Sequence, residues 1–175
     1  NNSCLFDIER LLLFKIEIPE KDKERIKADF QNLRDISKLL NDSENTQREV
    51  EILNLIKNQL ETRGRAVLPI SYKNEEGKND IFPCIFQKNE DGQIQCYLMT
   101  KGEGIQYHPA IKHTEVKDLH SYRSTAITID ANDLFGKRGI QFFSKLANYH
   151  SQKVAIEPLE IYQLVAKMGE LRSEE

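Results

Sequence analysis

The chain has 175 residues, of which 39 % are hydrophobic and 30 % charged, and this is enough to bury one hydrophobic core. Its net charge of −3 excludes the broad basic surface that non-specific nucleic-acid binding needs. No apolar run approaches the roughly 20 residues that cross a bilayer, so we expect no membrane span. We therefore expect one domain over residues 1–175, with a helical N-terminal part (1–64) followed by a sheet with C-terminal helices (65–175).

The N-terminal part has the periodicity of helices. A short helix is expected to begin near Cys4. Residues 20–40 carry apolar side chains at spacings of three and four, which predicts an amphipathic helix. Thr46 followed by Glu49 matches a capping box, so a second helix is expected to start there and to end at Gly64. The two longer helices should form a hairpin.

Residues 65–100 have the alternation of three β-strands, 65–73, 80–88 and 93–100, joined by tight turns. Asp91-Gly92 is a strong hairpin signal, because both residue types tolerate positive φ. Both faces of the strands carry apolar residues, so both should be covered at least in part. Pro69 and Pro83 cannot donate to a β-ladder and should face an edge or a bulge.

The C-terminal part mixes strands and helices. Residues 125–129 read as a strand, 133–149 as a long helix and 153–156 as a short strand, and Pro158 suits the first turn of a last helix. The strand-helix-strand piece fits a parallel βαβ crossover. The expected fold class is α+β: a central, mostly antiparallel sheet, made of the three-stranded meander and one or two further strands. An N-terminal helix hairpin and two C-terminal helices should flank it.

The three cysteines, Cys4, Cys84 and Cys96, form no C-x-x-C pair, which disfavours a zinc ribbon. Cys84 and Cys96 fall on adjacent predicted strands and are expected to be reduced and buried. Cys4 differs, because it directly precedes an apolar helical run. Unpaired N–H groups at a helix N-terminus stabilise a thiolate, so Cys4 is a candidate nucleophile that a histidine would serve as general base.

The segment Asn1-Asn2-Ser3-Cys4-Leu5-Phe6 resembles the nucleophile segment of papain-like cysteine proteases, and it is most similar to that of the ovarian-tumour-domain deubiquitinases, Asp-Gly-Asn-Cys-Leu-Phe. The histidine of that family comes late in the chain at a strand start, as His120 does here. The resemblance implies hydrolysis of amide or isopeptide bonds, with Cys4 as nucleophile, His120 as base, Asp130 as orienting acid and a ubiquitin-like substrate. Asp118 and Asp133 are alternative acids.

Other site chemistries have weaker signals. His108, His113 and His120 lie in the long segment 101–123 without a recognised metal-ligand spacing, so we predict no metal and no cofactor. Glu115-Val116-Lys117 imitates part of a nuclease core, but an acidic chain is a poor partner for DNA.

The opposing hypothesis is a non-catalytic protein-binding module, such as an adaptor, an effector domain or a secretion chaperone. Such a module would use a strand edge or a helical groove. Under either hypothesis the partner is a protein. The expected location is the cytoplasm, or a host cytosol if the chain is a secreted bacterial effector.

Overall fold

The computed structural model describes residues 18–74, 76–98, 110–112, 120–122, 125–151 and 156–169. Among these residues, two helices are followed by six strands and then by three helices. The order is α2 (Glu20–Asn41), α3 (Arg48–Arg63), β1 (Arg65–Lys73), β2 (Asn79–Lys88), β3 (Ile94–Leu98), β4 (Ala110–Lys112), β5 (His120–Tyr122), β6 (Thr125–Ile129), α4 (Ala131–Leu134), α5 (Lys137–Ser151) and α6 (Pro158–Ala166). None of these described helices is both long and apolar enough to span a membrane.

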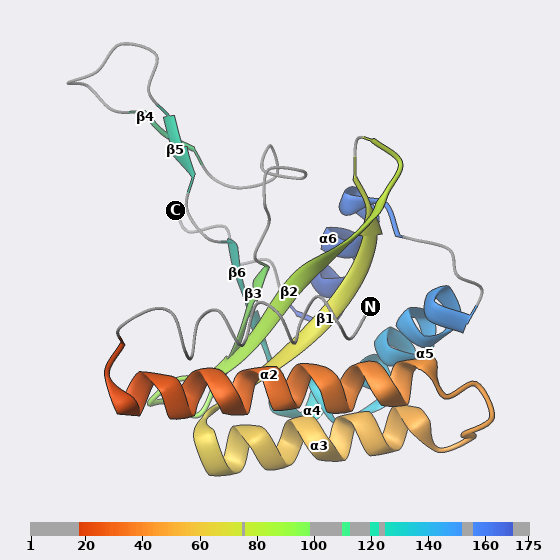
Figure 1. Ribbon diagram of the computed structural model, residues 1–175, viewed down its shortest axis with the longest axis horizontal. Helices are drawn as coiled ribbons and strands as arrows, with labels where there is room; N and C mark the ends of the chain where they lie inside the picture. Colours follow the sequence, from red (N-terminus) through yellow and green to blue (C-terminus); the bar gives the residue numbers. More distant parts are fainter. Residues whose placement is uncertain are drawn as a thin grey trace.

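The main sheet has the strand order β1-β2-β3-β6, and each neighbouring pair is antiparallel. β4 and β5 form a separate two-stranded hairpin (Figure 1). The expected α+β class is therefore confirmed, with the meander at the centre and β6 as the fourth strand. The predicted helix end is also confirmed, since Gly64 adopts the left-handed conformation and its N–H donates to the carbonyl of Leu60.

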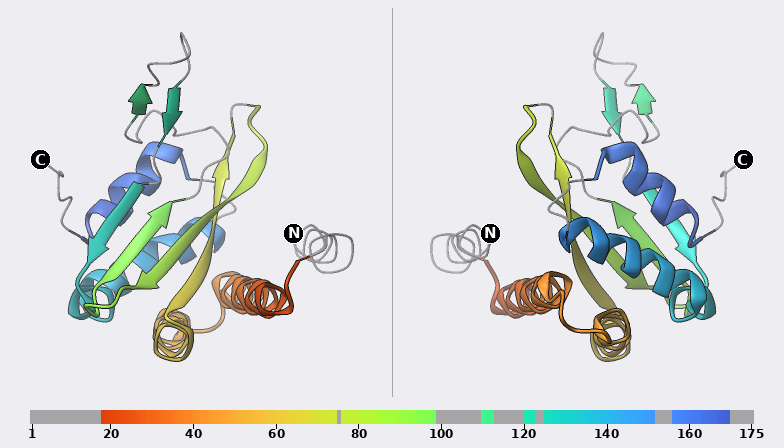
Figure 2. Two further views of the ribbon diagram at one scale, coloured as in Figure 1. Left: turned by 90° about the vertical axis from the view of Figure 1, so that its left-hand side faces the viewer. Right: turned by 90° about the vertical axis from the view of Figure 1, so that its right-hand side faces the viewer.

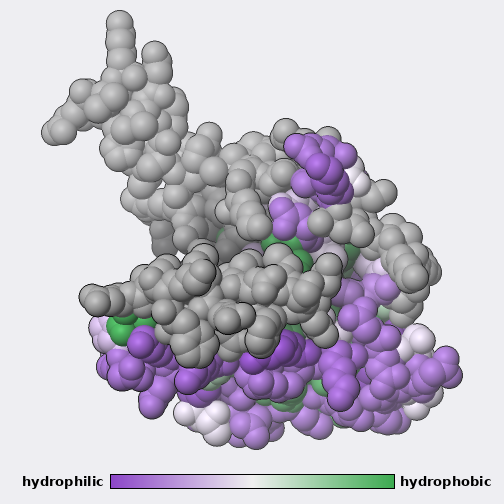
Figure 3. All heavy atoms as spheres, viewed as in Figure 1, coloured by the Kyte–Doolittle hydropathy of each residue, from purple (hydrophilic) through white to green (hydrophobic). Residues whose placement is uncertain are grey.

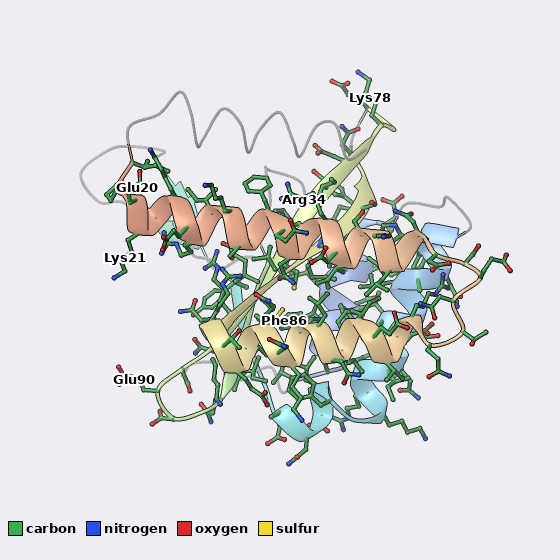
Figure 4. All side chains as sticks on the ribbon, turned by 60° about the horizontal axis from the view of Figure 1, so that its bottom comes forward. Glu20, Lys21, Arg34, Lys78, Phe86 and Glu90 are labelled. Atoms are coloured by element: carbon green, nitrogen blue, oxygen red, sulfur yellow. The ribbon has the colours of Figure 1, made fainter. Side chains whose placement is uncertain are left out.

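One face of the sheet forms the main core. The alternating residues on this face are buried, and α3, α5 and α6 supply the apolar side chains that cover them (Figure 2). Figure 4 places Phe86 of β2 among these interior side chains, whereas charged residues such as Glu20 and Glu90 lie at the periphery. The outward surface of α2 and α3 is mostly hydrophilic, as Figure 3 shows. The sequence pattern thus places the apolar stripes of the helices on the sheet.

Helix α2 lies along the edge strand β1 and contacts both faces of the sheet. Ile36 and Leu40 join the main core, while Leu33 packs with Val67 on the opposite face. Between them, the side-chain oxygen of Asn32 accepts a hydrogen bond from the backbone N–H of Val67. The described residues thus cover at least part of the second face, as the alternation predicts, with the side chains of Phe30, Ile81 and Ile85 partly buried around Leu33 and Val67.

An ionic cluster joins α2 to the start of the sheet. The carboxylate of Asp29 pairs with the guanidinium groups of Arg63 at 2.6 Å and of Arg65 at 3.1 Å. All three side chains are less than a third exposed, so solvent screens the pairs only in part. The cluster fixes the end of α3 and the first residue of β1 against the same turn of α2.

The two prolines of the meander differ in their position in the sheet. Pro69 lies on the edge strand β1, in the same alternation as Val67, whose N–H points away from β2 to Asn32. Pro83 lies on the central strand β2, one residue beyond the last described β2–β3 pair, Cys84 with Leu98. The expectation of an edge position is confirmed for Pro69. For Pro83 it stays a prediction, because the position that would face it on β3 lies outside the described residues.

The structure corrects three details of the sequence prediction. β6 is antiparallel to β3, and Ile156 forms an isolated parallel bridge with Tyr72 of β1 at the opposite edge of the sheet, so the segment between them is not a parallel βαβ crossover. The helix predicted over 133–149 is broken at residues 135–136 into α4 and α5. The capping box at Thr46 is wrong, because α3 starts at Arg48 and its N-cap is Gln47, whose side chain makes no capping hydrogen bond.

Candidate functional site

The three residues of the cysteine-hydrolase hypothesis are not brought together within the described structure. Cys4 lies outside the described residues. His120 begins β5, and Asp130 directly follows β6. Figures 1 and 2 show β5 beyond one end of β6 and α4 at the other end. The extended residues 125–129 alone span about 13 Å at roughly 3.3 Å per residue. The assignment of Cys4, His120 and Asp130 therefore stays a prediction.

Asp130 has a structural role that explains its position. It is the N-cap of α4, and its carboxylate accepts a hydrogen bond of 2.7 Å from the backbone N–H of Asn132. It lines a polar hollow of about 580 Å³ together with Asp91, Asp133, Thr128 and Arg138. The hollow thus contains the predicted orienting acid, Asp130, and one of its two alternatives, Asp133. The other alternative, Asp118, lies outside the described residues.

The described residues give no support to the metal-site and nuclease hypotheses. Among these residues no group of His, Cys, Asp or Glu side chains is arranged to hold a metal ion. His108, His113, Glu115 and Lys117 lie outside them. Asp80, the upstream acid of the nuclease comparison, accepts a hydrogen bond from the N–H of the next residue, Ile81.

Both edges of the main sheet are occupied. On β1, the N–H of Val67 donates a hydrogen bond to the side chain of Asn32, and Pro69 has no N–H. The carbonyl of Ser71 on the same strand accepts a hydrogen bond of 3.5 Å from the N–H of Ile156. On β6, the turn that follows α6 approaches so closely that a Cβ on Gly169 would lie 2.4 Å from the carbonyl oxygen of Thr128. Strand addition at these edges is therefore disfavoured, and a binding surface has to be sought on the helices.

A groove of about 530 Å³ lies between α5 and α6. Buried apolar side chains form its floor, namely Phe142 of α5 with Leu164 and Met168 from α6 and the turn after it. The other lining residues are Arg138, Ile140, Gln141, Ser144, Lys145 and Lys167. The groove therefore joins an apolar floor to a polar, cationic rim.

The periodicity of the two helices creates this arrangement. In α5, Phe142, Phe143 and Leu146 are buried, while Arg138 and Lys145 are exposed two helical turns apart. Lys167, after α6, is exposed on the other side of the groove. Ile140, at 42 % exposure, is one of the few large apolar side chains on the described surface.

The groove is positive although the chain is acidic. It has three cationic lining residues, and none of its described lining residues is acidic. Arg138 is partly neutralised by Asp133, at 3.6 Å, and both side chains are about half exposed. The positive potential therefore comes mainly from Lys145 and Lys167, in water-exposed positions where it is screened by salt.

A hydrogen bond closes the other end of the α5–α6 pair. The hydroxyl of Tyr149 donates to the carboxylate of Glu160, which raises the pKa of Tyr149. Tyr149 is near the end of α5 and Glu160 is in the first turn of α6, so the helices are antiparallel. The bond lies at the end of the pair opposite to Arg138 and Lys167.

Comparison of the chain with protein-family models, with curated proteins and with solved structures finds no match. The resemblance of residues 1–6 to ovarian-tumour-domain deubiquitinases therefore rests on those residues and His120 alone. Sequence reasoning did not identify the α5–α6 groove. The signal available for it was limited to Arg138 and Lys145 at a spacing of two helical turns, which puts both on the polar face of α5.

Proposed function

We propose that the protein is a binding module that holds an acidic, apolar segment of a partner protein in the α5–α6 groove. The observation that carries the proposal is the cationic rim of Arg138, Lys145 and Lys167 around an apolar floor. A segment with Leu or Phe side chains on one face and carboxylates beside them would complement both features.

The charge pattern favours this partner over a basic one or a nucleic acid. With a net charge of −3, the surface as a whole repels polyanions, whereas the groove is locally positive. A partner that carries a few carboxylates next to apolar side chains gains from the local charge. It also avoids most of the repulsion that a long polyanion would meet.

The experiment compares two synthetic peptides by fluorescence anisotropy. The first is rich in Leu and Glu, and the second has Lys in place of each Glu. We expect the acidic peptide to bind and the basic peptide not to bind. Added salt should weaken the binding, because the rim lysines are exposed.

Charge reversal at the rim gives the matched control. Exposed ion pairs are worth up to about 1 kcal/mol each. The double variant Lys145→Glu, Lys167→Glu should therefore weaken binding of the acidic peptide by about tenfold or more. Lys21→Glu with Lys27→Glu makes the same change in net charge on exposed positions of α2 and should leave binding unchanged. An equal loss with both pairs would mean that net charge, and not the groove, attracts the peptide.

A further inference from the structure

Two thiols lie side by side in the core of the sheet. Sγ of Cys84 on β2 and Sγ of Cys96 on β3 are 3.1 Å apart. Both residues are free cysteines with no exposed surface. The two strands are the central pair of the four-stranded sheet.

The strand register explains the contact. Cys84 is opposite Leu98, and Cys96 is opposite Phe86, so the two thiols are diagonal neighbours on the same face. A disulfide requires sulfur atoms about 2.05 Å apart, so the thiols must approach by about 1 Å from their observed 3.1 Å. Diagonal neighbours on antiparallel strands lie about 7–8 Å apart, which is beyond the usual Cα spacing of a disulfide. Forming the bond therefore requires β2 and β3 to shift toward each other, and a bond strained in this way is readily reduced.

We propose that Cys84 and Cys96 are an oxidation site, at which hydrogen peroxide forms a reversible disulfide between β2 and β3. One thiolate attacks a peroxide oxygen, giving a sulfenic acid and hydroxide. The second thiol attacks the sulfenic sulfur, forms the S–S bond and releases water. In total, two thiols are oxidised and one peroxide is reduced to two waters.

The surroundings determine the course of this reaction. Burial, the hydrogen bond with Cys84 and its charge raise the pKa of the Cys96 thiol, so the reaction is slow. A small, uncharged oxidant is the one that can reach a thiol in such a packed core. Once one sulfur is a sulfenic acid, the neighbouring thiol is already in contact and reacts with it before further oxidation.

The test uses a Cys4→Ser variant, in which Cys84 and Cys96 are the only thiols of the original three cysteines. The native protein is treated with hydrogen peroxide and its intact mass is measured with and without dithiothreitol. We expect a loss of about 2 Da, the two hydrogens of disulfide formation, with both thiols disappearing together. Dithiothreitol should restore the original mass, and non-reducing proteolysis should yield one linked peptide pair.

A Cys4→Ser, Cys96→Ala variant is the control, since alanine keeps the position apolar. Its remaining cysteine, Cys84, should either stay a thiol or gain the oxygens of sulfenic and sulfinic acid. The mass of this variant should not fall by the roughly 2 Da that accompany disulfide formation. The proposal is overturned if the two-thiol protein, still folded by circular dichroism, keeps both thiols or gains oxygen at either sulfur. A disulfide found only between two copies of the chain would also overturn it.

Discussion

The side-chain oxygen of Asn32 on α2 lies 2.5 Å from the backbone nitrogen of Val67 on β1 and accepts its hydrogen bond. The N–H of Val67 points outward from the edge strand, and none of the described strands pairs with it there. Asn32 is 2 % exposed, so water does not reach this site freely. The helix thus closes a strand edge with a side chain.

Removal of this side chain should destabilise the protein. In Asn32→Ala the N–H of Val67 stays buried without an acceptor, which costs about 1–3 kcal/mol of unfolding free energy. Equilibrium unfolding in urea measures the change. Asn54→Ala is the matched control on the exposed face of α3, where we expect a change within about 0.5 kcal/mol. Equal losses in the two variants would show that Asn32 does not close the edge.

The break between α4 and α5 makes a second prediction. A Cβ on Gly139 would lie 1.6 Å from the carbonyl oxygen of Leu134, so Gly139→Ala must move one helix away from the other. We expect a loss of more than about 2 kcal/mol, as for other overpacked sites. Gly64→Ala, which has open space but a φ of +68°, should cost only about 1 kcal/mol. Urea unfolding measures both losses of unfolding free energy. A smaller loss for Gly139→Ala than for Gly64→Ala would mean that α4 and α5 are packed less tightly at Gly139 than described.

The protein should lose stability when the pH falls through about 6.5. Desolvation, with a smaller contribution from the charge of Arg48, lowers the pKa of His150 below its ordinary value of 6.5. Its Nε2 is buried and has no hydrogen-bond partner among the described residues. Below pH 6.5 the unfolded chain binds the proton more readily than the folded protein, so the unfolding free energy decreases as the pH falls toward the folded pKa.

His150→Gln isolates this contribution, because the other three histidines titrate in both proteins. The variant should have a shallower dependence of unfolding free energy on pH between about 5 and 7. The measurement is urea unfolding at several pH values. Parallel curves for the two proteins would mean that His150 has the same pKa folded and unfolded.

The cysteine-hydrolase hypothesis predicts an unequal reactivity of the three thiols. Iodoacetamide should label Cys4 rapidly below pH 7, and His120→Ala should slow that labelling, since a thiolate paired with a histidine reacts well below the ordinary pKa of about 8.5. Cys84 and Cys96 should label slowly in the native protein because both are fully buried. Mass spectrometry of the native protein would read all three rates. Slow labelling of Cys4 would leave only the binding hypothesis.

Much of the fold could be predicted because local signals and burial agree. The alternation in 65–73 and 80–88 places the same residues inward as the structure does. Gly64 ends α3 because glycine readily adopts the left-handed conformation of a helix C-cap. The break at residues 135–136 could not be predicted from periodicity. It depends on the contact of Gly139 with Leu134, which only the folded chain creates.

The candidate site was harder to predict than the fold. The resemblance implies that Asp130, at the end of a strand, is the orienting acid. The same position is that of an N-cap, and the carboxylate of Asp130 accepts a hydrogen bond from the N–H of Asn132. The groove depends on the antiparallel packing of α5 and α6, which brings Lys167 across from Arg138. No spacing within either helix encodes that pairing.

The most direct test of the binding module is to locate the acidic peptide on the protein. Nuclear magnetic resonance titration of the ¹⁵N-labelled chain with the Leu- and Glu-rich peptide reports which backbone amides change. We expect the largest shifts along the groove, at Ile140, Lys145, Leu164 and Lys167, and little change at Asn32 and Val67 on the far edge. Shifts that are absent from the groove, or that spread evenly over the lysines of α2, would contradict the account.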